Sequence, residues 1–138
     1  MTVIVTDSGF GVDGFTGDIV ALDQIPANDA TGLGVDVPSS ADPAALTPFL
    51  GDLALIRIDF PSFADGRGFT IARLLRLAGF RGILRAKGHV IADQYAMARR
   101  SGFDEVEISA DLAARQPQDQ WLARANWRAH DYQSRLRA

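Results

Sequence analysis

Short apolar runs and longer helical patterns alternate regularly between residues 53 and 110. The short runs predict three strands, and apolar residues at intervals of three and four predict two helices between them. A glycine follows each predicted helix, where helices commonly end. Strands that alternate with single helices predict right-handed crossovers and a mostly parallel βαβαβ sheet with flanking helices. The predicted strands are Leu53–Ile58, Gly82–Ala86 and Glu105–Ile108, and the predicted helices are Thr70–Ala78 and Val90–Ser101.

Each predicted helix has one apolar face that would pack against the sheet. These faces consist of Ile71, Leu74, Leu75 and Ala78 in the first helix, and of Ile91, Tyr95 and Ala98 in the second. A final helix is predicted around Gln118–Trp127, docked through Trp121, Leu122 and Ala125.

The first forty residues are rich in glycine, aspartate and threonine and predict short strands joined by turns. Asp42 as N-cap and Pro43 in the first turn predict a helix that ends by Gly51. No linker divides the chain, so we expect one α/β domain over residues 1–138, with a strand- and turn-rich N-terminal arm (1–40) and a βαβαβ core (53–110). The predicted N-terminal strands are Thr2–Thr6, Phe15–Leu22 and Gly34–Val37, with a polar loop at Pro26–Thr31.

The composition restricts the class of protein. At 138 residues the chain is long enough for one core and too short for two independent ones. It contains no cysteine, which excludes a disulfide, a thiolate nucleophile and a cysteine-held metal cluster. No apolar run approaches the roughly 18 residues that span a bilayer, and the first residues do not resemble a signal peptide. We therefore expect a cytoplasmic protein outside the membrane.

The net charge of −3 conceals a strong segregation. Residues 1–56 contain eight Asp and no Lys, Arg or Glu, whereas residues 57–100 contain nine Lys or Arg against three Asp. The default interpretation is that this acidic arm and this basic centre pair within the molecule. In the alternative interpretation, the basic segment attracts an anion or an acidic partner. Nucleic acid is disfavoured, because the whole chain is acidic and has no basic run interleaved with aromatic residues.

Each predicted strand of the core places one charged residue between two apolar ones. Because side chains alternate along a strand, Arg57, Arg85 and Glu107 are predicted to project from the same face of the sheet. Neighbouring arginines need a negative group between them. Glu107 would supply it in a structural charge ladder, which is the favoured interpretation, and a bound oxyanion would supply it in a binding site.

A glycine-bracketed arginine precedes the first predicted helix, after the carboxyl end of a strand, where parallel sheets bind ligands. Its guanidinium and the backbone N–H groups at the helix start would hold an anion, with the preceding aspartate orienting the arginine. In the alternative interpretation, the aspartate–arginine pair only stiffens a tight loop whose aromatic residues fill the core. The spacing fits neither a P-loop nor a dinucleotide fingerprint. The turn consists of Asp65, Gly66, Arg67 and Gly68, and the aromatic residues are Phe60, Phe63 and Phe69.

Four further polar residues follow the second core strand. Lys87 would bind an anion and His89 would transfer a proton, although a solvent-exposed turn is the commoner role of such residues. Asp93 and Gln94 fall in the first turn of the next predicted helix, where Asp93 meets the helix dipole favourably without any catalysis. With two histidines and no His-x-Glu or Glu-x-x-His pattern, we expect no metal site. No motif for a cofactor is found either, so none is expected.

These motifs resemble those of a bacterial family catalogued as domain of unknown function 934, over residues 34–133. The family's Phe-Pro-x-Phe-x-Asp-Gly-Arg-Gly-Phe-Ser/Thr and Ala-Arg-Leu-Leu-Arg motifs appear here as Phe60–Thr70 and Ala72–Arg76. His89 and Ser101 stand where family members often have an acidic residue and a cysteine, and the missing cysteine argues against an essential thiol. Further matches are Gly79–Gly88, Asp93 with Gln94, Gly102–Asp104, and Tyr132 with Gln133.

The resemblance implies a protein encoded beside sulfite reductase and adenylylsulfate reductase, labelled an oxidoreductase of sulfite reduction. From it we expect an accessory protein of assimilatory sulfate and sulfite reduction that binds one of these reductases through the basic central segment. Two alternatives stay open: an enzyme that clamps a sulfur oxyanion such as sulfite, and a module that senses a sulfur metabolite. The expected anion- or partner-binding residues are Arg57, Asp65, Gly66, Arg67, Gly68, Arg85, Lys87, His89, Asp93, Gln94 and Glu107.

Overall fold

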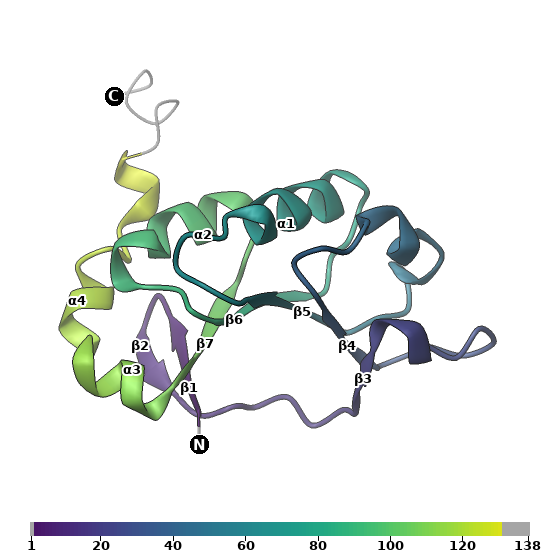
Figure 1. Ribbon diagram of the computed structural model, residues 1–138, viewed down its shortest axis with the longest axis horizontal. Helices are drawn as coiled ribbons and strands as arrows, with labels where there is room; N and C mark the ends of the chain where they lie inside the picture. The colour runs from purple at the N-terminus through teal and green to yellow at the C-terminus, as the bar shows by residue number, and fades with distance from the viewer. Residues whose placement is uncertain (1, 131–138) are drawn as a thin grey trace.

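The computed structural model describes residues 2–130 and contains one seven-stranded sheet in the order β2-β1-β7-β6-β5-β4-β3 (Figure 1). Strands β3 to β7 run parallel to one another, whereas β1 is antiparallel to both β7 and β2. The predicted α/β fold, with a mostly parallel sheet and short N-terminal strands, is therefore confirmed. The strands are β1 Thr2–Thr6, β2 Gly9–Gly11, β3 Ile19–Ala21, β4 Gly34–Val37, β5 Leu55–Phe60, β6 Ile83–Gly88 and β7 Glu105–Ser109.

The two predicted crossovers are present, because α1 joins β5 to β6 and α2 joins β6 to β7. Within the described residues, no helix is both long and apolar enough to cross a membrane. The α-helices are α1 Arg67–Leu77, α2 Tyr95–Ser101, α3 Ala110–Arg115 and α4 Gln118–Leu122. The 3₁₀ helices are η1 Leu22–Gln24, η2 Pro43–Phe49, η3 Ala92–Gln94 and η4 Trp127–His130.

The strand order explains why the helices cover one face of the sheet. Strands β4 to β7 follow one another in both sequence and space, so each connection steps in the same direction. Crossovers of one hand that all step the same way must lie on one face. Helices α1 and α2 accordingly lie together above the sheet, while the connection between β2 and β3, residues 12–18, passes beneath it (Figure 1). We call the face away from α1 and α2 the open face.

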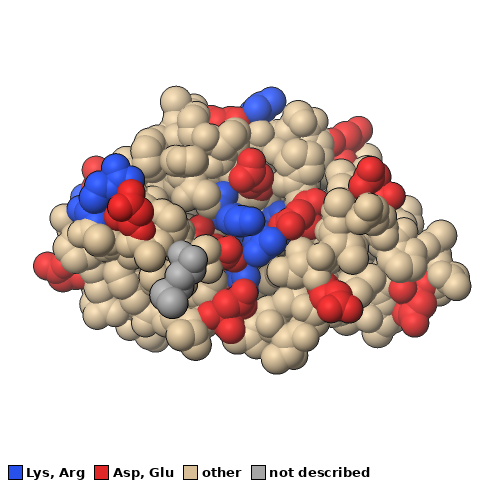
Figure 2. Space-filling view, turned by 60° about the horizontal axis from the view of Figure 1, so that its bottom comes forward, with Lys and Arg blue, Asp and Glu red and all other residues tan. Residues whose placement is uncertain are grey.

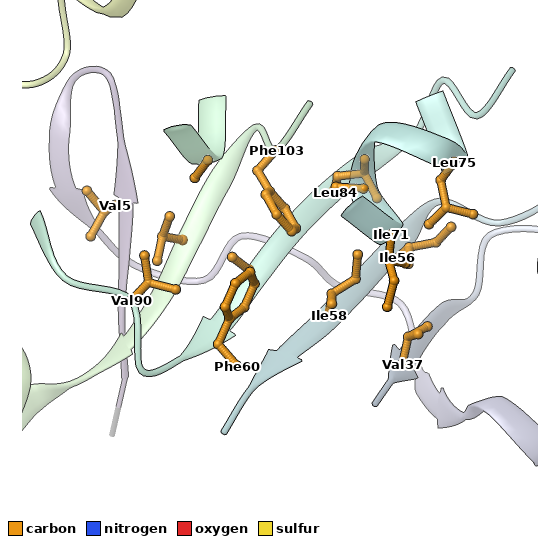
Figure 3. Packing of buried hydrophobic residues seen from close by; sticks show 14 of the residues in the cluster. Val5, Val37, Ile56, Ile58, Phe60, Ile71, Leu75, Leu84, Val90 and Phe103 are labelled. Atoms are coloured by element: carbon orange, nitrogen blue, oxygen red, sulfur yellow. The ribbon is translucent and has the colours of Figure 1, made fainter. Parts of the chain in front are cut away.

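The main core lies between the sheet and these helices (Figure 3). Alternation along β5 directs Ile56, Ile58 and Phe60 into this core. The Phe60 ring packs edge-on against Phe103, with 5.8 Å between the ring centroids. Burying one such aromatic side chain contributes about 1.5–3 kcal/mol to the free energy of unfolding. The intervening Arg57 side chain is consequently directed to the open face.

Two glycines of the motifs are explained by packing around Phe60. At Gly68, in the first turn of α1, an added Cβ would lie 2.5 Å from the Cζ atom of the Phe60 ring. Gly88, at the end of β6, has a φ of +114°, and a Cβ there would lie 2.7 Å from the carbonyl oxygen of Phe60. Glycine at these two positions is therefore required for the close approach of α1 and of the end of β6 to β5, independently of any binding role of the motif.

The N-terminal arm differs from the prediction in two places. The predicted strand Phe15–Leu22 is reduced to β3, because Asp13 accepts a hydrogen bond from the N–H of Phe15 and turns the chain into the connection across the open face. Strand β2 was not predicted, since two of its three residues are glycine, which has a low strand propensity. It forms a hairpin with β1.

Several helices also differ from the prediction. The helix capped by Asp42 is the 3₁₀ helix η2, because Pro48 within it lacks the N–H that an α-helix would use. The segment predicted as Val90–Ser101 divides into η3 and α2, since the Gln94 side chain accepts a bond from the N–H of Ile91 and closes a separate turn. Helix α1 begins earlier, at Arg67, α3 was not predicted, and the final helix ends at Leu122.

The predicted helix faces are only partly correct. Ile71 and Leu75 are buried against the sheet, but Leu74 is 45% exposed and Ala78 is exposed. In the last helix, Trp121 is 1% exposed, whereas Leu122 is 39% exposed. The buried stripe is therefore narrower than the apolar stripe in the sequence, and large apolar side chains are left on the surface of α1.

Substitution of Gly68 tests the packing around Phe60. Gly68→Ala should lower the free energy of unfolding by about 1–3 kcal/mol, because the added methyl group displaces the ring. Urea denaturation measures the change. The matched control is Gly51→Ala, where the added Cβ has no neighbour within 4 Å, and which should change stability by less than about 1 kcal/mol. Equal effects at both positions would contradict the packing account.

Candidate functional site

The open face of the sheet carries a group of charged side chains from four adjacent strands. Arg57 and Arg85 are register partners on β5 and β6, and Lys87 is the register partner of Glu107 on β7. Figure 2 shows basic side chains gathered in the middle of this face with acidic ones around them. Arg57, Arg85 and Glu107 therefore share one face, as side-chain alternation predicts.

Arg85 is the most buried of these groups, with 1% of its side chain exposed. Its Nη1 lies 2.9 Å from Oε1 of Glu107, which is 4% exposed, and its Nε lies 3.1 Å from Oε2 of Glu105. Asp13, from the connection beneath the sheet, accepts from both Nη atoms at 3.1 and 2.8 Å. Every nitrogen of the guanidinium thus donates to a carboxylate.

Arg57 is held in the same way by its neighbours. Asp36 on β4 accepts from its Nε at 2.6 Å and from its Nη2 at 2.9 Å. The Oε1 atom of Glu107 lies 3.1 Å from Nη1 of Arg57, so one oxygen of Glu107 bridges both arginines. This geometry supports the charge-ladder interpretation, since the negative group between the arginines belongs to the protein. We call Asp13, Asp36, Arg57, Arg85, Glu105 and Glu107 the charge network.

The environment of the charge network shifts the pKa of Asp13 and that of Glu105. The hydrogen bonds from Arg85 hold the pKa of Asp13 below its ordinary value, despite partial burial. At Glu105 the larger effect is burial, which raises the pKa even though Arg85 opposes the rise. The two carboxyl groups on one guanidinium are therefore shifted in opposite directions.

The acidic arm pairs with the basic centre within the molecule. Asp7, Asp13 and Asp36 pair with Arg99, Arg85 and Arg57 respectively. The default interpretation of the charge segregation is thus supported by three ion pairs across long sequence distances. The central cations that remain outside these pairs include Arg67, Arg73 and Arg100, whose side chains are exposed.

At the turn 65–68, the Asp65 carboxylate binds the Arg67 side chain that was expected to hold an anion, whereas its backbone donor is the N–H of Arg67 and not that of Gly68 or Phe69. It accepts from the backbone N–H of Arg67 at 3.1 Å and from the Arg67 side chain at Nε (3.0 Å) and Nη2 (2.7 Å). Arg67 Nη2 also donates to Ser39 Oγ at 2.9 Å. These bonds keep the pKa of Asp65 far below its usual range. The geometry favours the interpretation of a stiffened loop, because Asp65 holds both Nε and Nη2 of Arg67.

The aromatic residues of this loop were predicted to fill the core. Phe60 is 1% exposed and its ring centroid lies 5.0 Å from that of the partly buried Phe69, as expected. For Phe63 the prediction was wrong, because this side chain is 43% exposed. It instead packs edge-on against the ring of His89, where the chain leaves β6.

The remaining expected residues lie apart from the charge network. His89 is exposed, and its Nδ1 lies 3.3 Å from the carbonyl oxygen of Phe60. Asp93 accepts a bond from Arg124 at 2.7 Å, and Gln94 donates to the carbonyl oxygen of Phe63 at 2.9 Å. Both lie in the 3₁₀ helix η3, which leads directly into α2, and Asp93 is in the first turn of η3. A binding role for these residues stays a prediction.

Three members of the charge network were missed: Asp13, Asp36 and Glu105. A sequence signal exists for Glu105, which lies two residues before Glu107 on the same strand and therefore shares its face. Asp36 likewise alternates with Val35 and Val37 on a predicted strand. Asp13 gave no such signal, because it lies in a loop 72 residues from Arg85. Within the described part of the chain, no three His, Asp or Glu side chains are placed to hold a metal ion.

Comparison with known proteins gives a match over most of the chain. A family model described as "Bacterial protein of unknown function (DUF934)" matches residues 34–138. The matched region includes the turn 65–68 and every member of the charge network except Asp13. No curated protein and no solved structure matches the chain.

Removal of the Arg85 charge tests whether the network is structural. Arg85→Met should lower the free energy of unfolding by about 3–5 kcal/mol, because it leaves Glu105 without its cation and the buried Glu107 with Arg57 alone. Urea denaturation measures this loss. Arg73→Met, on the exposed surface of α1, is the control and should stay within about 0.5 kcal/mol of the unsubstituted protein. A loss at Arg85 no larger than that of the control would contradict a structural role.

Acid should weaken the link between Asp13 and Arg85. The folded pKa of Asp13 lies below the unfolded value of about 4, so its carboxylate stabilises the fold above that pH. The contribution disappears as the pH falls through the folded pKa. The difference in unfolding free energy between the unsubstituted protein and Asp13→Asn should therefore shrink below about pH 4. Asp18→Asn, in the same connection but without a bond to Arg85, is the control; the same pH course for both variants would contradict the assignment.

Proposed function

Because the chain belongs to the DUF934 family of bacterial proteins, we propose that it is an accessory protein of assimilatory sulfate and sulfite reduction that binds a reductase through its basic central segment. The metabolic setting follows from the resemblance of its motifs to those of proteins encoded beside these reductases. The binding surface is proposed from the geometry of the helices.

The observation that carries this proposal is a set of exposed apolar side chains on the outer side of the helix layer. Leu74 and Leu77 of α1 are 45% and 75% exposed, and Met97 of α2 is 54% exposed. The two helices lie side by side over the same face of the sheet (Figure 1). Exposed apolar residues that gather on neighbouring elements are typical of a protein-binding surface.

Cations accompany these apolar residues. Arg73 lies beside Leu74 and Leu77 on the exposed side of α1, and Arg100 lies three residues after Met97 on α2. Neither arginine forms an ion pair with another described side chain, whereas Arg57, Arg85 and Arg99 are already paired. We call Arg73, Leu74, Leu77, Met97 and Arg100 the docking face. A partner that fits it presents an apolar patch bordered by carboxylates.

The alternatives in which the protein binds a sulfur oxyanion, as an enzyme or as a sensor, have less support. The Nε and Nη2 atoms of Arg67 already bind the Asp65 carboxylate, and the arginines of the open face already bind Asp13 and Asp36. A free oxyanion would have to replace a carboxylate that is covalently part of the protein. Intramolecular competition of this kind lowers the affinity for an anion.

A binding experiment with purified reductases tests the proposal. Tagged protein should retain sulfite reductase or adenylylsulfate reductase stoichiometrically, and the rate of sulfite reduction should change when it is added. Leu77→Glu should weaken retention by at least about tenfold, because it places a charge in the apolar centre of the docking face and repels an acidic partner. High salt should also weaken retention.

Val12→Glu is the matched control, because Val12 is an apolar residue of 89% exposure in the connection beneath the sheet. It should leave both retention and rate unchanged. Retention of neither reductase, with no change in rate, would remove the proposed function. Equal loss with both variants would show that the docking face is not the binding surface.

A further inference from the structure

A pocket of about 760 Å³ lies at the carboxyl ends of the parallel strands β3 to β6. This is the edge at which open parallel sheets bind ligands, and volumes of roughly 300–1,000 Å³ are usual for sites that hold a small molecule. The 3₁₀ helices η1 and η2 contribute to its walls. We call it the carboxyl-edge pocket. It contains neither the turn 65–68 nor any residue of the docking face.

One part of the pocket wall is apolar. Leu22 and Ala45 from the two 3₁₀ helices face it together with Val37 and Pro38 at the end of β4. An apolar wall of this kind holds a hydrocarbon side chain and gains free energy from the surface that it removes from water.

The polar part of the pocket contains charged groups that lack partners. Asp59 and Lys87 are register partners on β5 and β6, and both side chains lie on the open face and line the pocket. Among the side chains of residues 2–128, neither group forms an ion pair, and the same is true of Asp23 at the η1 wall. Asp36 also reaches the pocket, but Arg57 binds both of its oxygens.

This arrangement sets the chemistry of a matching ligand. One free ammonium group, from Lys87, fits a single carboxylate, and the free carboxylates of Asp59 and Asp23 fit an ammonium group. A sulfate, sulfite or phosphate would meet one cation beside two carboxylates and is repelled. A simple amine would leave Lys87 without a partner. We propose that the carboxyl-edge pocket binds a small zwitterion, an α-amino acid with an aliphatic or thioether side chain.

Calorimetry with three matched ligands tests the proposal directly. L-Leucine carries both charges, 3-methylbutylamine lacks the carboxylate, and 4-methylpentanoate lacks the ammonium group. Leucine should bind on the order of tenfold more tightly than either analogue, the effect of one charge-assisted hydrogen bond. Saturable binding should also raise the melting temperature of the protein. No binding of leucine or L-methionine, or equal affinity for leucine and one analogue, would overturn the proposal.

Two variants separate the roles of the charges. Lys87→Gln should reduce the affinity for leucine to that for 3-methylbutylamine, and Asp59→Asn should reduce it to that for 4-methylpentanoate. Arg81→Gln is the control, since Arg81 is exposed in the connection between α1 and β6 and outside this pocket, and it should bind leucine normally. Thermal denaturation of each variant establishes that it is folded. Unchanged leucine binding by Lys87→Gln would overturn the proposal.

Discussion

The buried guanidinium of Arg85 joins three parts of the chain that are distant in sequence. It lies on β6, binds Glu105 and Glu107 on β7, and holds Asp13 in the connection that crosses beneath the sheet. The network exists because the strand order places α1 and α2 on the opposite face. None of the described helices covers the centre of this face of the sheet. The paired charged side chains and the connection of residues 12–18 cover it instead. Loss of Arg85 would leave Glu105 without its cation and Glu107 with one arginine in place of two.

This arrangement leaves some charged and apolar groups available for binding and others already paired within the protein. The arginines of the open face bind carboxylates of the acidic arm and of β7, so the charge segregation of the sequence is mainly an internal feature. The groups still free to bind lie on the outer side of the helices and at the carboxyl edge of the sheet. The proposed docking face and the carboxyl-edge pocket share no residue, so occupation of one would not directly block the other.

The sequence predicted the parts that depend on local pattern. The βαβαβ order and the shared face of Arg57, Arg85 and Glu107 follow from periods of 3.6 and 2. The pairing of Arg85 with Asp13 does not follow from these periods, because it depends on the path that a loop takes across the folded sheet. Helix α3 had a local signal that was overlooked: Ser109 ends β7 and caps the helix by accepting from the N–H of Leu112 at 3.1 Å. Gly68 was assigned to anion binding, whereas its close contact with Phe60 requires a glycine there, as the contact of Gly88 with Phe60 also does.

The most direct test of this account is a double-mutant cycle between Arg85 and Glu107, measured by urea denaturation. Arg85→Met leaves Glu105 without its cation, and Glu107→Leu removes the carboxylate that Arg57 and Arg85 share, so each should be destabilising alone. The double variant removes both charges and should recover much of the loss, with a coupling energy of about 1–3 kcal/mol. Additive losses would contradict the account, since they would show that the two charges do not depend on each other.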